Sequence, residues 1–171
     1  MNTSQLWKGW SDQVICVQET RVGVNNHRTT ARHVKAHGRT FFPGRLLPGL
    51  INSQGIQKSS HGGTAIMGLE AITTPFDCSD DATGLYAKCH KTFRVTAAWV
   101  QVAPKIRLLV FSLYLKTAAS ALADVVKYNE EILTDVFSIC SQFGDIPCVI
   151  AGDLQLRPDC YEPVSLSLIH I

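Results

Sequence analysis

Two acidic residues follow short apolar segments of the chain, and their positions suggest chemistry at the end of a sheet. Glu19 comes after VICVQ, and Asp153 comes after CVIAG. Functional side chains of α/β proteins gather where strands end. Carboxylates at such an edge can bind a hard divalent cation such as Mg²⁺, which prefers oxygen ligands and keeps several waters. Each acid taken alone also fits an ordinary turn.

The residues around Asp153 add an amide to this acid. In the segment IPCVIAGDLQLRPD, Gly152 stops an apolar run, Asp153 follows it, and Gln155 comes two residues later. Glycine at this place lets the backbone pass close to a neighbouring strand or a ligand. This corner of the chain thus carries an acid and an amide two residues apart.

Hydrophobic periodicity predicts the elements that must hold these residues. The segments with strand character are residues 12–20, 39–44, 62–69, 92–103, 105–115 and 146–153, of which the fourth and fifth read as an antiparallel hairpin. Helical periodicity covers residues 25–38 and 118–143, and Asn25 or Asn26 is expected to cap the first helix. Residues 44–61 read as a loop, and residues 70–91 read as irregular and polar. This order of strands and helices describes an α/β layered domain.

Composition places the chain among soluble globular domains. It has 171 residues, of which 46% are hydrophobic, and no apolar run long enough to span a bilayer. The N-terminal residues do not read as a signal peptide. The six cysteines form no CxxC pair, and Cys16, Cys140 and Cys148 lie in apolar periodic segments, so we expect reduced core thiols and an intracellular protein.

Basic residues are concentrated in one part of the chain. Residues 20–69 contain seven Lys or Arg and no Asp or Glu, whereas the remainder holds nine basic and fourteen acidic residues. A solvated basic face explains this pattern, and so does a surface that meets nucleic acid. The sequence alone favours the former and leaves the latter open.

Four motifs together resemble the endonuclease/exonuclease/phosphatase superfamily of metal-dependent phosphodiesterases. VICVQET is similar to its Gln-Glu-Thr metal motif, HGGTAIM to its Gly-Gly strand, FSLYL to its strand ending in Asn-x-Tyr, and IAGDLQLRP to its Gly-Asp-Phe-Asn-x-x-Pro motif. Order and approximate spacing agree from Val14 to Pro158. With its QETRV opening at residues 18–22 and a long helix before the Gly-Asp motif, the chain most resembles the AP-endonuclease-like endonuclease domains of non-LTR retrotransposons. The resemblance implies a layered α/β sandwich of the superfamily's type.

The resemblance also implies roles for individual residues. Glu19 would be the ligand of Mg²⁺, with Mn²⁺ as an alternative ion. Asp153 would orient or deprotonate the attacking water, and the amide of Gln155 would help to orient the phosphate. Tyr114 matches the tyrosine that hydrogen-bonds near the scissile phosphate. The implied reaction is in-line attack of water on a phosphodiester.

The chain also departs from the superfamily's pattern. Ser112 replaces the Asn of Asn-x-Tyr, and the first strand and the closing Ser-Asp-His segment find no match. We therefore expect residues 1–165 to be a partial domain that lacks its C-terminal part. The last six residues, LSLIHI, can be encoded by the end sequence of a transposase-based sequencing adapter, so we interpret residues 166–171 as an artefact tail. Accordingly, His170 is not assigned as the catalytic histidine, and His61 is interpreted as a loop residue.

These features lead to an expected function and two alternatives. We expect a Mg²⁺-dependent phosphodiesterase or endonuclease domain acting on DNA, derived from a retrotransposon, intracellular with the nucleus as one location, and inactive or nearly so as this chain. A non-catalytic remnant that binds nucleic acid is one alternative. A phosphatase of the same superfamily acting on a phospholipid or an inositol phosphate is the other. We also expect one apolar face of residues 92–103 or 105–115 to lie uncovered.

Overall fold

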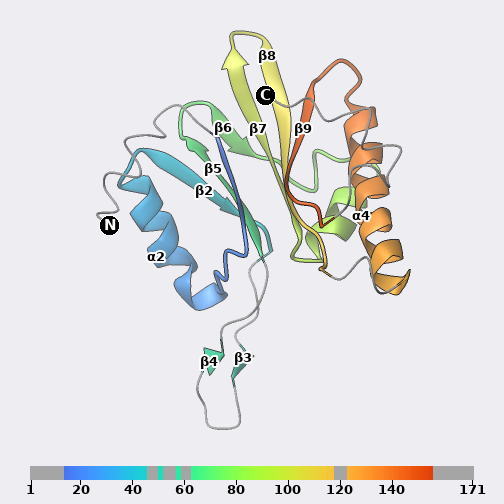
Figure 1. Cartoon of the computed structure of the whole chain (residues 1–171). Helices are drawn as coiled ribbons and strands as arrows, with labels where there is room; N and C mark the ends of the chain where they lie inside the picture. The colour runs from blue at the N-terminus through green and yellow to red at the C-terminus, as the bar shows by residue number, and fades with distance from the viewer. Residues whose placement is uncertain (1–13, 46–49, 52–56, 59–62, 118–122, 156–171) are drawn as a thin grey trace.

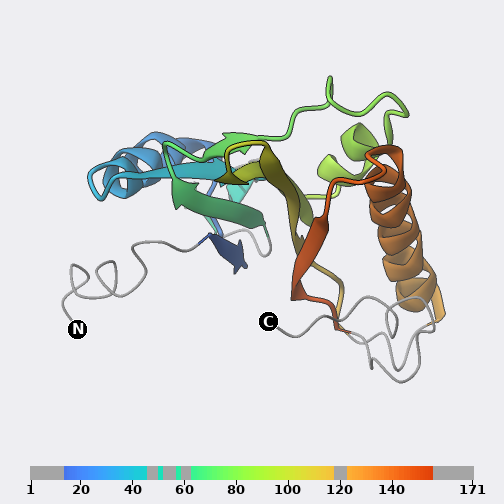
Figure 2. The same cartoon turned by 90° about the horizontal axis from the view of Figure 1, so that it is seen from above.

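The chain folds into two β-sheets that lie face to face between outer helices. The computed structural model describes residues 14–45, 50–51, 57–58, 63–117 and 123–155 (Figure 1). Seen from above, helix α2 lies on one side of the pair of sheets and helix α4 lies on the opposite side (Figure 2). The expected α/β layered sandwich is therefore confirmed.

The first sheet has three strands in the order β1-β5-β2. Its central strand β5 (Thr64–Leu69) pairs antiparallel with β1 (Ile15–Gln18) and with β2 (Arg39–Pro43). A separate pair, β3 (Leu50–Ile51) and β4 (Gln57–Lys58), lies within the segment that was expected to be a loop. Strand β1 is half-buried at the edge of its sheet, so the continuous apolar run did not require cover on both faces.

The second sheet has four strands in the order β6-β7-β8-β9. Strands β6 (Thr73–Pro75), β7 (Val95–Ala103) and β8 (Ile106–Tyr114) are antiparallel, and the β7–β8 hairpin is the one expected from the sequence. Strand β9 (Cys148–Asp153) pairs with β8 in parallel. Parallel strands need a crossover connection, and α4 supplies it. The carboxyl ends of β8 and β9 consequently meet at the same edge of the sheet.

The part of the chain that the structure describes has three helices, which cover the two sheets. Helix α2 (Val24–Lys35) begins one residue after Gly23, whose backbone is extended, so the expected cap by Asn25 or Asn26 is wrong and both residues lie in the first turn. Helix α3 (Leu85–His90) is short, and α4 (Ala123–Gln142) is the long helix expected from the periodicity. Its expected first residues, 118–122, lie outside the described residues. No described helix is both long and apolar enough to cross a bilayer.

The segment of residues 70–91 differs from its expected irregular structure. It contains strand β6 and helix α3, and its residues Phe76, Tyr86 and Cys89 are buried in the largest hydrophobic cluster. The ring of Phe76 packs edge-on against Tyr86, with the centroids 4.8 Å apart. The segment therefore contributes to the core, although its composition is typical of a surface loop.

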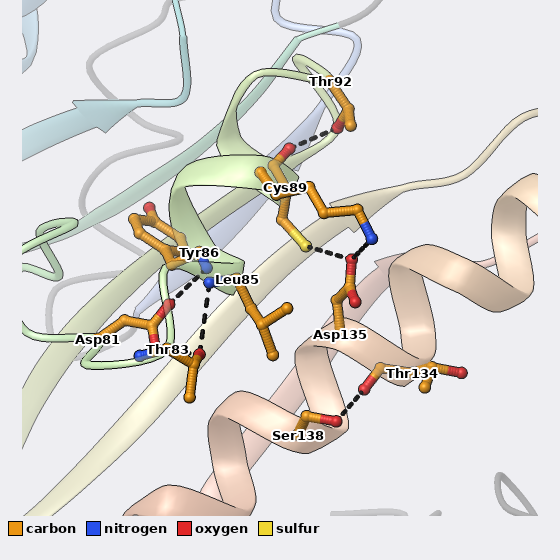
Figure 3. Close-up of polar contacts among 10 residues, drawn as sticks. Asp81, Thr83, Leu85, Tyr86, Cys89, Thr92, Thr134, Asp135 and Ser138 are labelled. Carbon is orange, nitrogen blue, oxygen red and sulfur yellow. Dashed lines mark hydrogen bonds and ion pairs between the residues drawn. The ribbon is translucent and has the colours of Figure 1, made fainter.

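Polar residues in the same segment, which were expected to form a loop, stabilise the start of α3 through hydrogen bonds. The buried carboxylate of Asp81 accepts hydrogen bonds from the backbone N–H of Tyr86 at 2.6 Å and from the Thr83 hydroxyl at 2.6 Å (Figure 3). The side-chain amide of Gln142 on α4 donates to the same carboxylate at 2.9 Å. Burial acts to raise the pKa of Asp81, but these hydrogen bonds outweigh it and the pKa lies below its ordinary value.

Both faces of the β7–β8 hairpin are covered, so the expected uncovered apolar face does not occur among the described residues. One face packs against α3 and α4, and the other packs against the first sheet. Exposed large hydrophobic side chains on this hairpin are Val102 and Ile106 at its tip, which are 53% and 54% exposed. The five described cysteines are free, and Cys89 is the fully buried one, whereas Cys16, Cys140 and Cys148 are half-buried.

We predict that Gly152→Ala destabilises the fold more than Gly38→Ala. Gly152 has a φ of 144°, and an added Cβ would collide with the carbonyl group of Leu113 on the neighbouring strand. We expect at least about 2 kcal/mol of lost unfolding free energy, from the close contact and the unfavourable backbone together. Gly38 has a φ of 71° but open space around it, so the matched variant should cost only about 1 kcal/mol. Urea unfolding measures both values, and equal losses would contradict the prediction.

Candidate active site

The parallel pairing of β8 and β9 places Tyr114 beside Asp153. The two residues are register partners at the last position of each strand. The backbone N–H of Leu115 donates to the carbonyl oxygen of Asp153 at 2.9 Å, so the pairing continues one residue beyond β8. The tyrosine and the acid that the motifs single out therefore occupy one edge of the second sheet.

Glu19 reaches the same edge from the other sheet. It follows the last residue of β1, and β1 packs against both β8 and β9. The hydroxyl of Tyr114 donates a hydrogen bond to Oε1 of Glu19 at 2.6 Å. This contact joins residues that are 95 positions apart in the chain. A site shared by both sheets, which we call the rim site, is thus formed by Glu19, Tyr114, Asp153 and Gln155.

Gln155 is attached to the rim site through Asp153. Its backbone N–H donates to Oδ1 of Asp153 at 3.3 Å, and its side-chain amide donates to Oδ2 of the same carboxylate. Both oxygens of Asp153 therefore accept a hydrogen bond, which fixes the orientation of the carboxylate. The amide was expected to orient a phosphate, and in this structure it orients the acid. The chemical roles assigned to all four residues stay predictions.

The backbone at the rim site is strained at three residues other than glycine. The φ angles of Glu19, Arg21 and Gln155 are 49°, 50° and 50°. Side chains with a Cβ avoid this left-handed region, at a cost on the order of 1 kcal/mol for each residue. Such conformations cluster where the surrounding structure holds a functional side chain in place. Here they turn the chain sharply at the ends of β1 and β9.

Two arginines that sequence analysis did not assign to the site lie next to the rim residues. Nη2 of Arg21 is 3.6 Å from Oε2 of Glu19, and both side chains are about half-exposed. Nη1 of Arg94 donates to the carbonyl oxygen of Tyr114 at 2.8 Å, and its guanidinium lies 5.3 Å from the centre of the Tyr114 ring. Arg21 belongs to the QETRV motif and could have been included. Arg94 precedes β7 and carries no sequence signal of its own.

A layer of hydrogen-bonded polar side chains lies between the two sheets, next to the rim site in the sequence of β1 and β8. Gln18 of β1 donates to the hydroxyl of Ser112 on β8 at 3.2 Å, and that hydroxyl lies 3.4 Å from the carbonyl oxygen of Val17. The hydroxyls of Thr64 and Thr96 are 2.6 Å apart, and this contact joins β5 to β7. Ser112 therefore ties the first sheet to the second.

The donor set of the rim site fits Mg²⁺ and does not fit a zinc-type cluster. Its potential ligands are the carboxylates of Glu19 and Asp153, and Mg²⁺ uses one or two carboxylates with several waters. Among the described residues there is no group of three or more His, Cys, Asp or Glu that could hold a metal ion. His61 and His170, and the boundary between residues 1–165 and 166–171, lie outside the described residues.

We predict that Glu19→Gln lowers the pKa of Tyr114. The hydrogen bond to the Glu19 carboxylate is the main cause that raises this pKa above its ordinary value, burial adds to it, and Arg94 opposes it. A carboxylate favours the protonated phenol that donates to it, so replacement by a neutral amide removes most of the shift. Absorbance titration near 295 nm, with Tyr114→Phe subtracted, measures the change. An unchanged pKa in the Glu19→Gln protein would show that the hydrogen bond does not form in solution.

Searches among known proteins found similarity in structure alone. No family model matches the chain, and no curated protein matches it. The catalytic domain of human Nocturnin superposes with a TM-score of 0.54 at 14% identity, covering 96% of this chain and 58% of that one. ANGEL2, a 2',3'-cyclic phosphatase, gives a TM-score of 0.57 at 15% identity, covering 92% and 44%. The AP endonuclease LMAP from Leishmania major gives 0.55 at 13% identity, covering 89% and 49%.

At these identities the similarity concerns the fold. The chain spans about half the length of the structures it matches, although nearly all of it takes part in each superposition. Their shared architecture is that of the endonuclease/exonuclease/phosphatase superfamily. This chain therefore has about half of the endonuclease/exonuclease/phosphatase fold.

Proposed function

We propose that the rim site is the metal and phosphate site of a divalent-metal-dependent phosphodiesterase. The observation that carries this proposal is the hydrogen bond of Tyr114 to Glu19 at the place where Tyr114 pairs with Asp153. It brings a potential metal ligand, a potential phenol donor and a second carboxylate to one edge of two sheets. The motif resemblance and the shared fold support the same assignment.

Each residue of the rim site has a role in this proposal. Glu19 holds Mg²⁺ or Mn²⁺, which when bound neutralises charge on the phosphoryl and leaving oxygens. Asp153, kept in one orientation by Gln155, accepts a proton from the attacking water or orients it. The Tyr114 hydroxyl has one proton, so in this proposal it gives up its bond to Glu19 and donates to a phosphate oxygen when substrate is bound.

We further propose DNA as the substrate, in an intracellular protein of retrotransposon origin that acts in the nucleus. The basic composition of residues 20–69 supports a polyanionic substrate. The AP endonuclease from Leishmania major has the same fold. The resemblance of the QETRV opening to retrotransposon endonuclease domains supports the origin.

We predict that Glu19→Gln weakens Mn²⁺ binding by at least about tenfold, since it removes the one charged ligand to which the proposal assigns the ion. Glu131→Gln is the matched control, because Glu131 is an exposed acid on α4. Calorimetric titration of the three proteins with Mn²⁺ gives the affinities. Equal affinities in all three would remove Glu19 from the proposed metal site.

A hydrolysis assay on the same protein completes the test. Nicking of supercoiled plasmid with Mg²⁺ is compared between the wild-type chain and Asp153→Ala. We expect little or no nicking by either protein, because the superfamily's catalytic histidine finds no match in this sequence and members of a catalytic unit act together. Nicking that requires the metal and disappears in Asp153→Ala would overturn this expectation, while supporting the role of Asp153.

A further inference from the structure

Helix α2 carries three basic side chains on one side. Arg28, Arg32 and Lys35 stand at positions i, i+4 and i+7, which share one side of an α-helix. All three side chains are exposed, and the helix contains no acidic residue. Figure 1 shows α2 on the outer side of the first sheet.

The fold does not use this side of α2. The helix packs on β2, and its less exposed positions are His27, Thr30, Ala31 and Val34, of which only Val34 is buried. These four residues share a different side of the helix from the arginines. The helix stabilises the fold through the side that carries Val34. The exposed arginines on the other side take no part in that packing, so the stability of the fold does not explain them.

The basic residues differ in how far they are neutralised. Nζ of Lys35 lies 3.5 Å from Oε1 of Glu70, so Lys35 has an acidic partner. Arg28 and Arg32 form no ion pair with any acidic side chain of the described residues. Their two positive charges are therefore available to an anionic partner, whereas the charge of Lys35 is partly offset.

We propose that α2 is a docking surface for the phosphate backbone of duplex DNA, with Arg28 and Arg32 as its main contacts. The choice of DNA rests on the proposed function. The rise of about 6 Å between the two arginines lets them reach separate phosphates, because each strand of a duplex places one every ~3.4 Å along the axis. The surface begins near the rim site, since α2 starts three residues after Arg21.

An anionic membrane is the other polyanion that a basic helix can meet. Helices that lie on membranes insert an apolar face between the lipids. In α2 the side with Ala31 and Val34 faces β2, and Val24 is the large hydrophobic residue that the helix exposes, at 60%. These features favour a nucleic acid as the partner over a lipid surface.

The test measures how salt weakens binding to a fluorescein-labelled duplex of 20 base pairs, by anisotropy. Each lost phosphate contact should reduce the slope of log K against log salt by about 0.9, so Arg28→Gln with Arg32→Gln should reduce it by about 1.8. Lys35→Gln should change the slope less than either arginine, because Glu70 already neutralises Lys35. Lys127→Gln, at an exposed basic residue of α4, should leave the slope unchanged.

The outcomes separate this inference from the proposed function. A double-arginine variant with the wild-type slope, or a wild-type protein that binds no duplex at ~50 mM salt, would overturn the docking surface. Stronger binding to vesicles containing phosphatidylserine, lost in the same variant, would overturn the choice of DNA. Mn²⁺ affinity and the salt slope are measured separately, so metal binding can fail while the docking surface stands, and the reverse. Circular dichroism checks that each variant is folded.

Discussion

The parallel pairing of β8 with β9 is the constraint on which the rim site depends. It places Tyr114 opposite Asp153, and an antiparallel pairing would send the two residues to opposite edges of the sheet. Helix α4 makes the crossover, and its buried side chains anchor it to the sheet through the largest hydrophobic cluster. Gly152 permits the close approach of the two strands just before the acid.

The second constraint is the buried polar layer between the two sheets. Hydrophobic contacts alone allow two sheets to slide, because they are not directional. The bonds between Gln18 and Ser112 and between Thr64 and Thr96 are directional, and an unpaired polar group in this interior would carry a penalty of a few kcal/mol. The first bond fixes β1 against β8 and the second fixes β5 against β7, so that Glu19, the residue after β1, meets Tyr114.

The sequence predicted the elements that have a clear period, and the residues that lie in motifs. The β7–β8 hairpin and α4 repeat at strand and helix periods, and Glu19 and Asp153 lie at or just after strand ends, so each could be identified. Tyr114 was identified through the motif resemblance. The elements of residues 70–91 could not be identified, because their core side chains follow no period and α3 is stabilised by contacts to Asp81 and α4. The turn of Gln155 back onto Asp153 depends on the left-handed backbone conformation of Gln155, which the residue types around it do not predict.

The central claim is that Glu19 and Asp153, one from each sheet, form one site in which Glu19 holds the metal. The most direct measurement is an anomalous difference map from crystals of this chain grown with Mn²⁺. The account predicts a peak at ligand distance, about 2.0–2.2 Å, from a carboxylate oxygen of Glu19, on the side that faces Asp153. A peak bound only to other carboxylates, such as those of α4, would contradict the account, as would a well-ordered rim site without any peak at saturating Mn²⁺.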